Sequence, residues 1–184
     1  MHTTILYVSG LGDRYDTLRR FCLGGWRLWG VSAKLVPMTW HDGEGFEQKY
    51  DRITDAINSI KDNSRIVVIG ESAGATIALQ VASHSKISRV ITLCGVAQPT
   101  TPISPHFNKR APALMPATRA VPNTNDYDVH SVRAAIDGVV GKKYSTATGA
   151  TRHTIWSTGH LLTILLCLTL LSSLMVTIAK TNKT

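Results

Sequence analysis

The segment 65–74 constrains the fold of this chain more than any other part of the sequence. It contains an unbroken run of β-branched residues, typical of a buried strand, and then places Ser72 between Gly70 and Gly74 at the spacing Gly-x-Ser-x-Gly. This is the pattern of a nucleophile elbow, a sharp strand-to-helix turn in which side chains at the glycines would collide with neighbouring backbone. We expect a helix from 72 to about 83, with its positive end beneath the serine. A plain glycine-serine turn after a buried strand is the alternative.

Strand-like and helix-like patterns alternate along the rest of the chain. Short apolar runs predict strands, and apolar residues at three- and four-residue steps predict helices. The strands are expected at 4–9, 33–38, 66–69, 88–94, 129–136 and 152–156, and the helices at 13–29, with Leu18, Cys22 and Trp26 on its apolar side, and at 44–61. Such alternation predicts a parallel sheet covered by helices on both faces. Pro37 places its strand at an edge, because proline cannot donate to the ladder.

One segment, 95–128, interrupts this alternation. It holds six of the seven prolines, so regular helix is confined to short pieces. Long loops in compact domains usually serve as lids or binding walls, and we interpret this segment as a lid-like insertion. Residues 141–150 are small and polar and predict a loop. The length of 184 residues supports a single domain, 1–184, with its own core.

Residues 161–179 carry no charge and form the strongest candidate for a membrane span, since about 20 apolar residues cross a bilayer. Their apolar side chains nevertheless include one helical stripe, opposite most of the polar residues, made of Leu161, Ile164, Leu168, Leu171, Met175 and Ile178. This pattern favours a terminal apolar helix packed on the sheet. Further leucines on its outer side suggest a homodimer contact or a peripheral membrane contact. A true membrane span is the alternative.

Charge and cysteine content bear on partners and location. The formal net charge is +8, but Lys and Arg are scattered, without a basic run or interleaved aromatics, so no nucleic-acid partner is expected. Cys22, Cys94 and Cys167 lie far apart in apolar sequence and predict buried thiols in a reducing compartment. With no visible secretory signal, the expected location is cytoplasmic. No Cys/His cluster or His-Glu-x-x-His motif is present, so neither a metal nor a cofactor is expected.

Three motifs follow the third, fifth and sixth expected strands: GESAG at 70–74, DGVV at 137–140 and GH at 159–160. Together they resemble the α/β-hydrolase superfamily, which uses the same order of nucleophile, acid and histidine along the chain. The resemblance covers nearly the whole chain. It implies a minimal three-layer α/β/α sandwich around a mostly parallel six-stranded sheet in the order 2-1-3-4-5-6. Relative to the eight strands usual in that family, the two N-terminal strands are missing.

The resemblance implies a serine esterase site. Ser72 is the expected nucleophile, His160 its base, and Asp137 the acid that orients the imidazole. All three follow strands whose carboxyl ends share one edge of the sheet, where open α/β sheets place their sites. The implied oxyanion hole consists of the backbone N–H groups of Leu11 and Ala73. The loop before Leu11 departs from the family, because the frequent His-Gly of that loop reads Ser-Gly here.

Other residues compete for these roles. Asp126 and Asp128 are acids near the end of the proline-rich segment, but they precede their strand and would lie at its opposite end. His41 and Asp42 resemble an acid–base pair after the second strand, although neighbours on an exit loop more often face solvent. The remaining histidines lack partner spacing and are interpreted as surface or satisfied core residues.

The expected activity is hydrolysis of a small-molecule carboxylic ester through an acyl-enzyme, with a carboxylesterase for small or medium acyl groups as the first hypothesis. Leu11, Trp40, Met115 and Trp156 are candidates for an apolar acyl pocket, although large aromatics at strand ends are more often packing residues. A lipase or thioesterase would use the same triad. The competing class is a non-catalytic binding module with an α/β-hydrolase-like fold.

Overall fold

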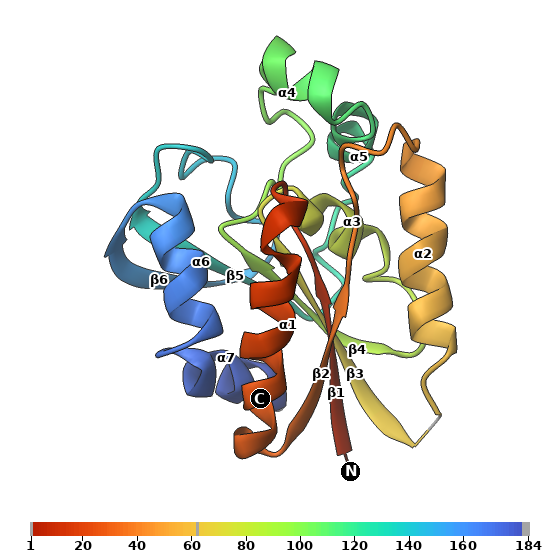
Figure 1. Ribbon diagram of the computed structural model, residues 1–184, viewed down its shortest axis with the longest axis vertical. Helices are drawn as coiled ribbons and strands as arrows, with labels where there is room; N and C mark the ends of the chain where they lie inside the picture. The colour runs from red at the N-terminus through yellow and green to blue at the C-terminus, as the bar shows by residue number, and fades with distance from the viewer. Residues whose placement is uncertain (1, 62, 182–184) are drawn as a thin grey trace.

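Six parallel strands form one sheet in the computed structural model, which describes residues 2–61 and 63–181 (Figure 1). Their order across the sheet is β2-β1-β3-β4-β5-β6, which confirms the order implied by the resemblance. The strands are β1 (His2–Val8), β2 (Val31–Val36), β3 (Ser64–Glu71), β4 (Ile87–Leu93), β5 (Val129–Ile136) and β6 (Thr151–Thr158). β3, which leads into the elbow, is buried over its last six residues because both faces of the sheet are covered there.

The second strand lies at an edge of the sheet, as its proline predicts. Its bounds differ from the expected 33–38, because β2 ends at Val36 and Pro37 follows it. Proline therefore ends the strand here and leaves no gap in its ladder. The opposite edge is formed by β6.

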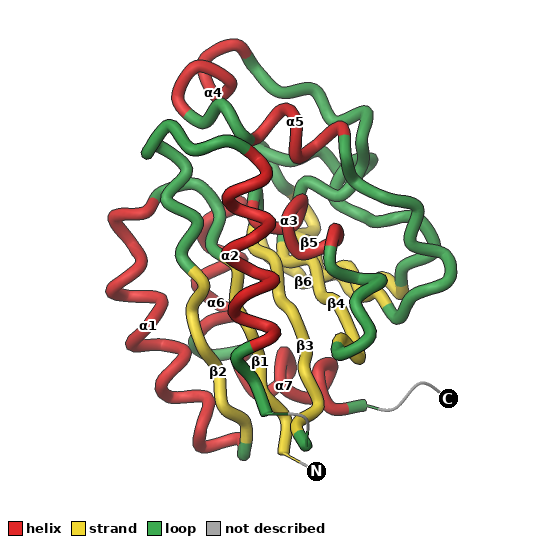
Figure 2. Tube along the Cα trace, turned by 90° about the vertical axis from the view of Figure 1, so that its right-hand side faces the viewer, coloured by secondary structure: helices red, strands yellow, loops and turns green. Residues whose placement is uncertain are grey.

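Helices cover both faces of the sheet, and each face has its own hydrophobic core (Figure 1 and Figure 2). Alternate residues of a strand enter the two cores, as with Val68 on one face and Val67 on the other. One face is covered by α1 (Asp16–Gly25), α6 (His160–Leu168) and α7 (Ser172–Lys180), and the other by α2 (Phe46–Asn58), α3 (Gly74–Gln80) and α5 (Leu114–Arg119).

The expected helix at 13–29 forms three consecutive helical pieces, the 3-10 turn η1 (Asp13–Tyr15), α1, and the 3-10 turn η2 (Trp26–Trp29). Its buried side differs from the prediction: Leu18 is exposed and Cys22 is only partly buried, whereas Arg19 and Leu23 are buried with Trp26. An arginine enters the interior here because its guanidinium finds acidic and carbonyl partners there. The other two thiols are buried as expected: Cys94 directly follows β4, and Cys167 lies in α6.

The segment 161–179, expected as one helix, forms two, because α6 and α7 are separated by a break and their axes differ by 74°. The indoles of η2 contact both sides of this break. Trp26 donates its ring N–H to the carbonyl oxygen of Leu168 at 3.0 Å, and Trp29 donates to Ser172 Oγ at 3.1 Å. No single helix in the described residues is both long and apolar enough to cross a bilayer; the bent α6–α7 pair meets the requirement by length and composition only.

The proline-rich segment holds two six-residue helices, α4 (Pro105–Arg110) and α5, which agrees with the short pieces that its prolines predict. In Figure 1, α4 lies beyond the carboxyl ends of the strands. Residues 141–150 form a loop, as expected. No helix therefore connects β5 to β6, and one face of this end of the sheet lacks a helical cover.

Candidate active site

Ser72 lies in the turn between β3 and α3 with a φ angle of 50°, in the left-handed region that non-glycine residues rarely adopt. Close packing requires glycine on both sides of it. A Cβ atom on Gly70 would lie 2.6 Å from the Cα of Ala75, and one on Gly74 would lie 2.5 Å from the carbonyl oxygen of Val8. These collisions confirm the steric reading of Gly-x-Ser-x-Gly. The helix that follows, α3, has only seven residues and is shorter than expected.

Three side chains from distant parts of the sequence meet beside this turn. Ser72 Oγ lies 2.9 Å from His160 Nε2, and His160 Nδ1 lies 2.8 Å from Asp137 Oδ2. With its proton on Nδ1, the imidazole donates to the carboxylate and accepts from the serine hydroxyl. Asp137 directly follows β5, and His160 is the first residue of α6. The structure thus brings together the three residues that the sequence singles out.

The Asp137 carboxylate is buried, with 3% of its side chain exposed. Burial by itself raises the pKa of this carboxyl, but hydrogen bonds from His160 and from the backbone N–H groups of Val139 and Val140 outweigh it. The pKa of Asp137 therefore lies below its ordinary value, and the group is ionised at neutral pH. An ionised carboxylate at this place stabilises a positive charge on the imidazole.

Cys94 lies against the same pair. In the part of the chain that the structure describes, Cys94, Asp137 and His160 form the only group of three or more His, Cys, Asp or Glu side chains that could hold a metal ion. Their potential ligand atoms all lie within 4.8 Å of one another. Burial, followed by the charge of Asp137, raises the pKa of the Cys94 thiol to about 12, so the thiolate that a metal prefers is disfavoured. His160 Nε2 already contacts Ser72, and His160 Nδ1 contacts Asp137. This chemistry fits a hydrogen-bonded triad better than a metal site.

The loop after β1, residues 9–12, lies next to the elbow. A Cβ atom on Gly10 would lie 2.7 Å from the carbonyl oxygen of Glu71, so only glycine permits this approach. Leu11 of this loop lines the same cavity as Ser72. Within residues 2–61 and 63–181, the N–H groups of Leu11 and Ala73 donate to no protein acceptor. Two backbone donors near the nucleophile are thus left without a partner in the protein.

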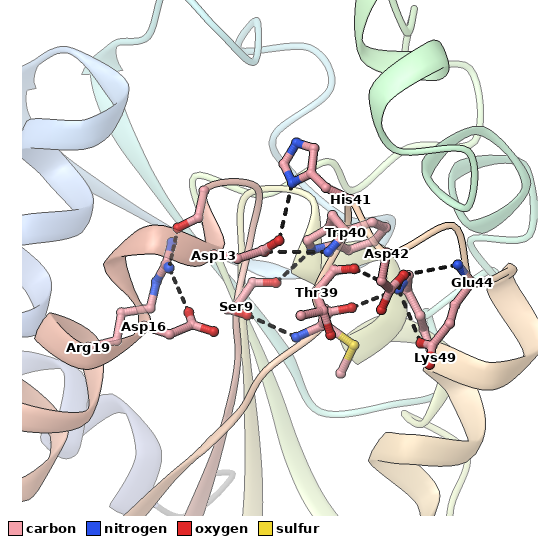
Figure 3. A network of polar contacts seen from close by, with 12 residues as sticks. Ser9, Asp13, Asp16, Arg19, Thr39, Trp40, His41, Asp42, Glu44 and Lys49 are labelled. Atoms are coloured by element: carbon pink, nitrogen blue, oxygen red, sulfur yellow. Dashed lines mark hydrogen bonds and ion pairs between the residues drawn. The ribbon is translucent and has the colours of Figure 1, made fainter.

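Polar contacts hold this loop from two sides (Figure 3). From the β2 side, the Trp40 indole N–H donates to the carbonyl oxygen of Ser9 at 3.0 Å, and the Met38 N–H donates to Ser9 Oγ at 3.1 Å. From the α1 side, Arg19 Nη1 donates to the carbonyl oxygen of Gly12 at 3.0 Å. The backbone on both sides of Leu11 is therefore fixed by side chains from neighbouring elements.

A buried ion pair connects this loop to the elbow. Arg19 donates to both carboxylate oxygens of Glu71, the residue before the nucleophile, and the Tyr7 hydroxyl donates to the same carboxylate at 2.7 Å. Burial, and then the charge of Glu71, raises the pKa of Tyr7 well above its ordinary value, so this hydroxyl stays a donor. Our sequence reasoning missed the pair. The available signal was Glu71 itself, an acid at the end of a buried strand, which requires a buried cation.

The cavity over Ser72 has a volume of about 710 Å³. Its apolar lining consists of Leu11, Tyr15, Phe107, Ala111, Val139, Leu161 and Ile164. Of the four residues expected to form an acyl pocket, Leu11 lines this cavity and the other three do not. Trp40 is fully buried against the loop at 9–12, Met115 lies on α5, and Trp156 is 93% exposed on the face of β6 that no helix covers. The pocket expectation is corrected accordingly.

The competing acids and bases lie elsewhere. Asp128 is at the start of β5, where its carboxylate accepts from Arg89 Nη2 at 2.7 Å. Asp126, two residues earlier, is exposed. His41 does line the cavity, but its Nδ1 lies 3.1 Å from Asp13 Oδ2 and not against Asp42. None of these groups contacts Ser72 or His160.

No family model matches this chain, and no curated protein matches it. Solved structures do resemble it. A metagenomic carboxyl esterase gives a TM-score of 0.68 at 15% identity, over 96% of this chain and 75% of that one. A pyrethroid hydrolase from Sphingobium faniae gives 0.66 at 12% identity, over 97% and 98%. A Xanthomonas campestris protein assigned to the α/β superfamily of hydrolases gives 0.65 at 17% identity, over 98% and 97%. The chain has the fold of the α/β-hydrolase superfamily.

Proposed function

We propose that the protein is a serine hydrolase that cleaves carboxylic esters through an acyl-enzyme intermediate. The observation that carries this proposal is the hydrogen-bonded chain from Ser72 through His160 to Asp137, with distances of 2.9 and 2.8 Å. A serine hydroxyl is a weak nucleophile at neutral pH, and this arrangement supplies the base and the orienting acid that it needs. The shared fold of a carboxyl esterase and a pyrethroid hydrolase supports the same reaction class.

In the proposed reaction, Ser72 Oγ attacks the ester carbonyl carbon while His160 Nε2 accepts its proton. The carbonyl electron pair moves onto oxygen, and the N–H groups of Leu11 and Ala73 stabilise this oxyanion. Collapse of the tetrahedral intermediate breaks the bond to the alkoxy oxygen, which leaves as the alcohol with the proton from His160. Water, activated by His160, then hydrolyses the acyl-enzyme by the same steps and releases the carboxylic acid.

The cavity favours an ester whose acyl group is small or medium and apolar. Its volume of about 710 Å³ and the apolar half of its lining suit such a group. A lipase or a thioesterase would use the same three residues, so the acyl length and the leaving group decide between these activities and a carboxylesterase.

The test is hydrolysis of p-nitrophenyl esters of increasing chain length by the wild type and by Ser72→Ala. We expect the wild type to prefer short or medium chains and Ser72→Ala to lose about 10⁴-fold or more in kcat. Parallel assays with an acyl thioester and a triglyceride then separate the thioesterase and lipase alternatives. Folded wild-type protein that binds esters but turns over none of these substrates would support the binding module and overturn the proposal.

A further inference from the structure

Exposed apolar side chains continue from the cavity over Ser72 onto the outer side of β6 and α6. Val139 and Leu161 line that cavity and are themselves largely exposed. Beyond them, four more apolar side chains face solvent. We call the six residues, which are between 43% and 93% exposed, the β6–α6 surface: Ile136, Val139, Trp156, Leu161, Leu162 and Leu165. A cluster of this kind on a folded domain usually marks a binding surface.

A second hollow, of about 780 Å³, lies within this surface at the β6 edge of the sheet. Ile136, Trp156 and Leu162 of the β6–α6 surface line it, and so do the cations Arg133 and Lys142. No acid is among its lining residues in the described part of the chain. Arg133 Nε is buried and has no hydrogen-bond partner among the described residues, so no carboxylate neutralises the guanidinium through this atom. The hollow therefore combines apolar walls with unneutralised positive charge.

The segment that builds this surface is strongly cationic. Residues 129–166 contain a single acid, Asp137, whose carboxylate is occupied by His160, against four basic residues: Arg133, Lys142, Lys143 and Arg152. A second copy seated on the same patch would bring like charges together without acids to pair them. An anionic lipid layer offers phosphates to the cations and hydrocarbon to the leucines and the tryptophan. Charge complementarity therefore favours lipid as the occupant.

We propose that the β6–α6 surface docks the protein on an anionic lipid–water interface. The inference rests on the proposed function and adds the source of the substrate, an ester carried in the lipid layer. The surface meets the cavity over Ser72 at Val139 and Leu161, so a lipid ester reaches the nucleophile from the docked side. The β6–α6 surface includes a residue adjacent to the triad in sequence, because Leu161 directly follows His160. Figure 1 shows β6 and α6 side by side, with α4 beyond the strand ends.

Co-sedimentation with vesicles tests the proposal, with phosphatidylcholine alone compared with phosphatidylcholine plus phosphatidylglycerol. We expect wild-type protein to bind the anionic vesicles, and added salt to weaken this binding. Leu162→Asp should reduce it about tenfold or more, because a charge replaces a leucine that enters the lipid layer. Lys142→Gln should reduce it about fivefold. The matched controls Leu28→Asp and Lys34→Gln, exposed positions outside the β6–α6 surface, should bind like the wild type.

Tryptophan fluorescence gives a second measurement. The emission should shift to the blue with anionic vesicles, and Trp156→Phe should remove most of this shift because Trp156 is the most exposed tryptophan. The docking proposal is overturned if wild-type protein binds neither kind of vesicle, or if Leu28→Asp weakens binding as much as Leu162→Asp. It is also overturned if the wild type is a dimer that Leu162→Asp converts to a monomer.

Hydrolysis of p-nitrophenyl acetate without lipid separates docking from catalysis. Leu162→Asp and Lys142→Gln should retain this activity, which also shows that they fold. Wild-type protein that binds anionic vesicles but hydrolyses no ester would support the docking surface and overturn the proposed function. Wild-type protein that hydrolyses the soluble ester but binds no vesicle would support the function and overturn the docking surface.

Discussion

Ser72 holds a backbone conformation that only its surroundings make tolerable. A φ of 50° costs a non-glycine residue on the order of 1–3 kcal/mol, and the close packing at Gly70 and Gly74 maintains it. The same conformation places Ser72 Oγ 2.9 Å from His160 Nε2. Strain at this one residue is therefore coupled to the geometry of the candidate site.

The sharpest prediction for a single residue concerns Asp137. Asp137→Asn keeps the shape of the side chain but removes the charge that holds the imidazole in its tautomer, so kcat for a p-nitrophenyl ester should fall about 10⁴-fold with the fold retained. Steady-state kinetics and circular dichroism check this. Asp128→Asn is the control, because it alters only the contacts with Arg89 and His130 and should leave kcat near the wild-type value. The reverse result would show that the acid is misassigned.

Among the elements, α1 and β3 are joined by a pair of charges in the interior. The side chains of Arg19 and Glu71 are 5% and 2% exposed, and Arg19 also reaches the carbonyl oxygen of Gly12 in the loop that carries Leu11. A buried charge without its partner is costly, so the two residues depend on each other. The pair ties the helix, the elbow and the loop into one unit.

Arg19→Met should therefore lower the free energy of unfolding by about 3–5 kcal/mol, since it leaves the Glu71 carboxylate buried without a cation. Urea denaturation measures the change. The double variant Arg19→Met with Glu71→Gln should recover part of the loss, whereas Arg20→Met on the exposed side of α1 should stay within about 0.5 kcal/mol of the wild type. Equal effects of Arg19→Met and Arg20→Met would refute the role given to the pair.

Strands β5 and β6 carry a second polar contact near their N-terminal ends, whereas the triad residues Asp137 and His160 follow the C-terminal ends of the same strands. His130 Nδ1 lies 2.8 Å from His153 Nε2, and the two rings stack with centroids 5.1 Å apart. Burial, and then the positive charge of Arg89, lowers the pKa of each histidine; for His130 the carboxylate of Asp128 opposes this shift without cancelling it. The folded state therefore favours the neutral form of both rings.

This contact predicts a pH dependence of stability. Histidines of the unfolded chain take up protons near pH 6.5, whereas His130 and His153 do so only at lower pH in the folded chain. The unfolded state then binds more protons, so the free energy of unfolding should fall as the pH drops below about 6.5. Denaturation at several pH values measures this slope. His153→Asn should flatten it and the exposed-site control His106→Asn should not; equal slopes in all three proteins would contradict the prediction.

For the molecule as a whole, the sequence was sufficient for the strand order and for the meeting of Ser72, Asp137 and His160. The positions of the strands and of the elbow follow from strong local signals, because buried parallel strands are continuous apolar runs and the elbow requires glycine. The strand order was implied by the resemblance to the α/β-hydrolase superfamily. Covalent order then restricts the topology, since residues that follow parallel strands share one edge of the sheet.

What the sequence did not reveal depends on contacts between distant segments. The break between α6 and α7 coincides with the hydrogen bonds from Trp26 and Trp29, which no periodicity in 161–179 encodes. The exposure of Trp156 depends on the loop at 141–150, which leaves the face of β6 opposite α6 without a helix. The burial of Arg19 depends on Glu71, more than fifty residues away. Trp40, Met115 and Trp156 were expected to line the cavity because of their side-chain type, and they do not line it.

The central claim is that Ser72 is a nucleophile activated by its neighbours, and active-site labelling tests it most directly. Wild-type protein treated with a fluorophosphonate probe should form a single covalent adduct, which peptide mapping by mass spectrometry should locate at Ser72, and Ser72→Ala should remain unlabelled. Folded wild-type protein that stays unlabelled, or an adduct that persists in Ser72→Ala, would contradict the account.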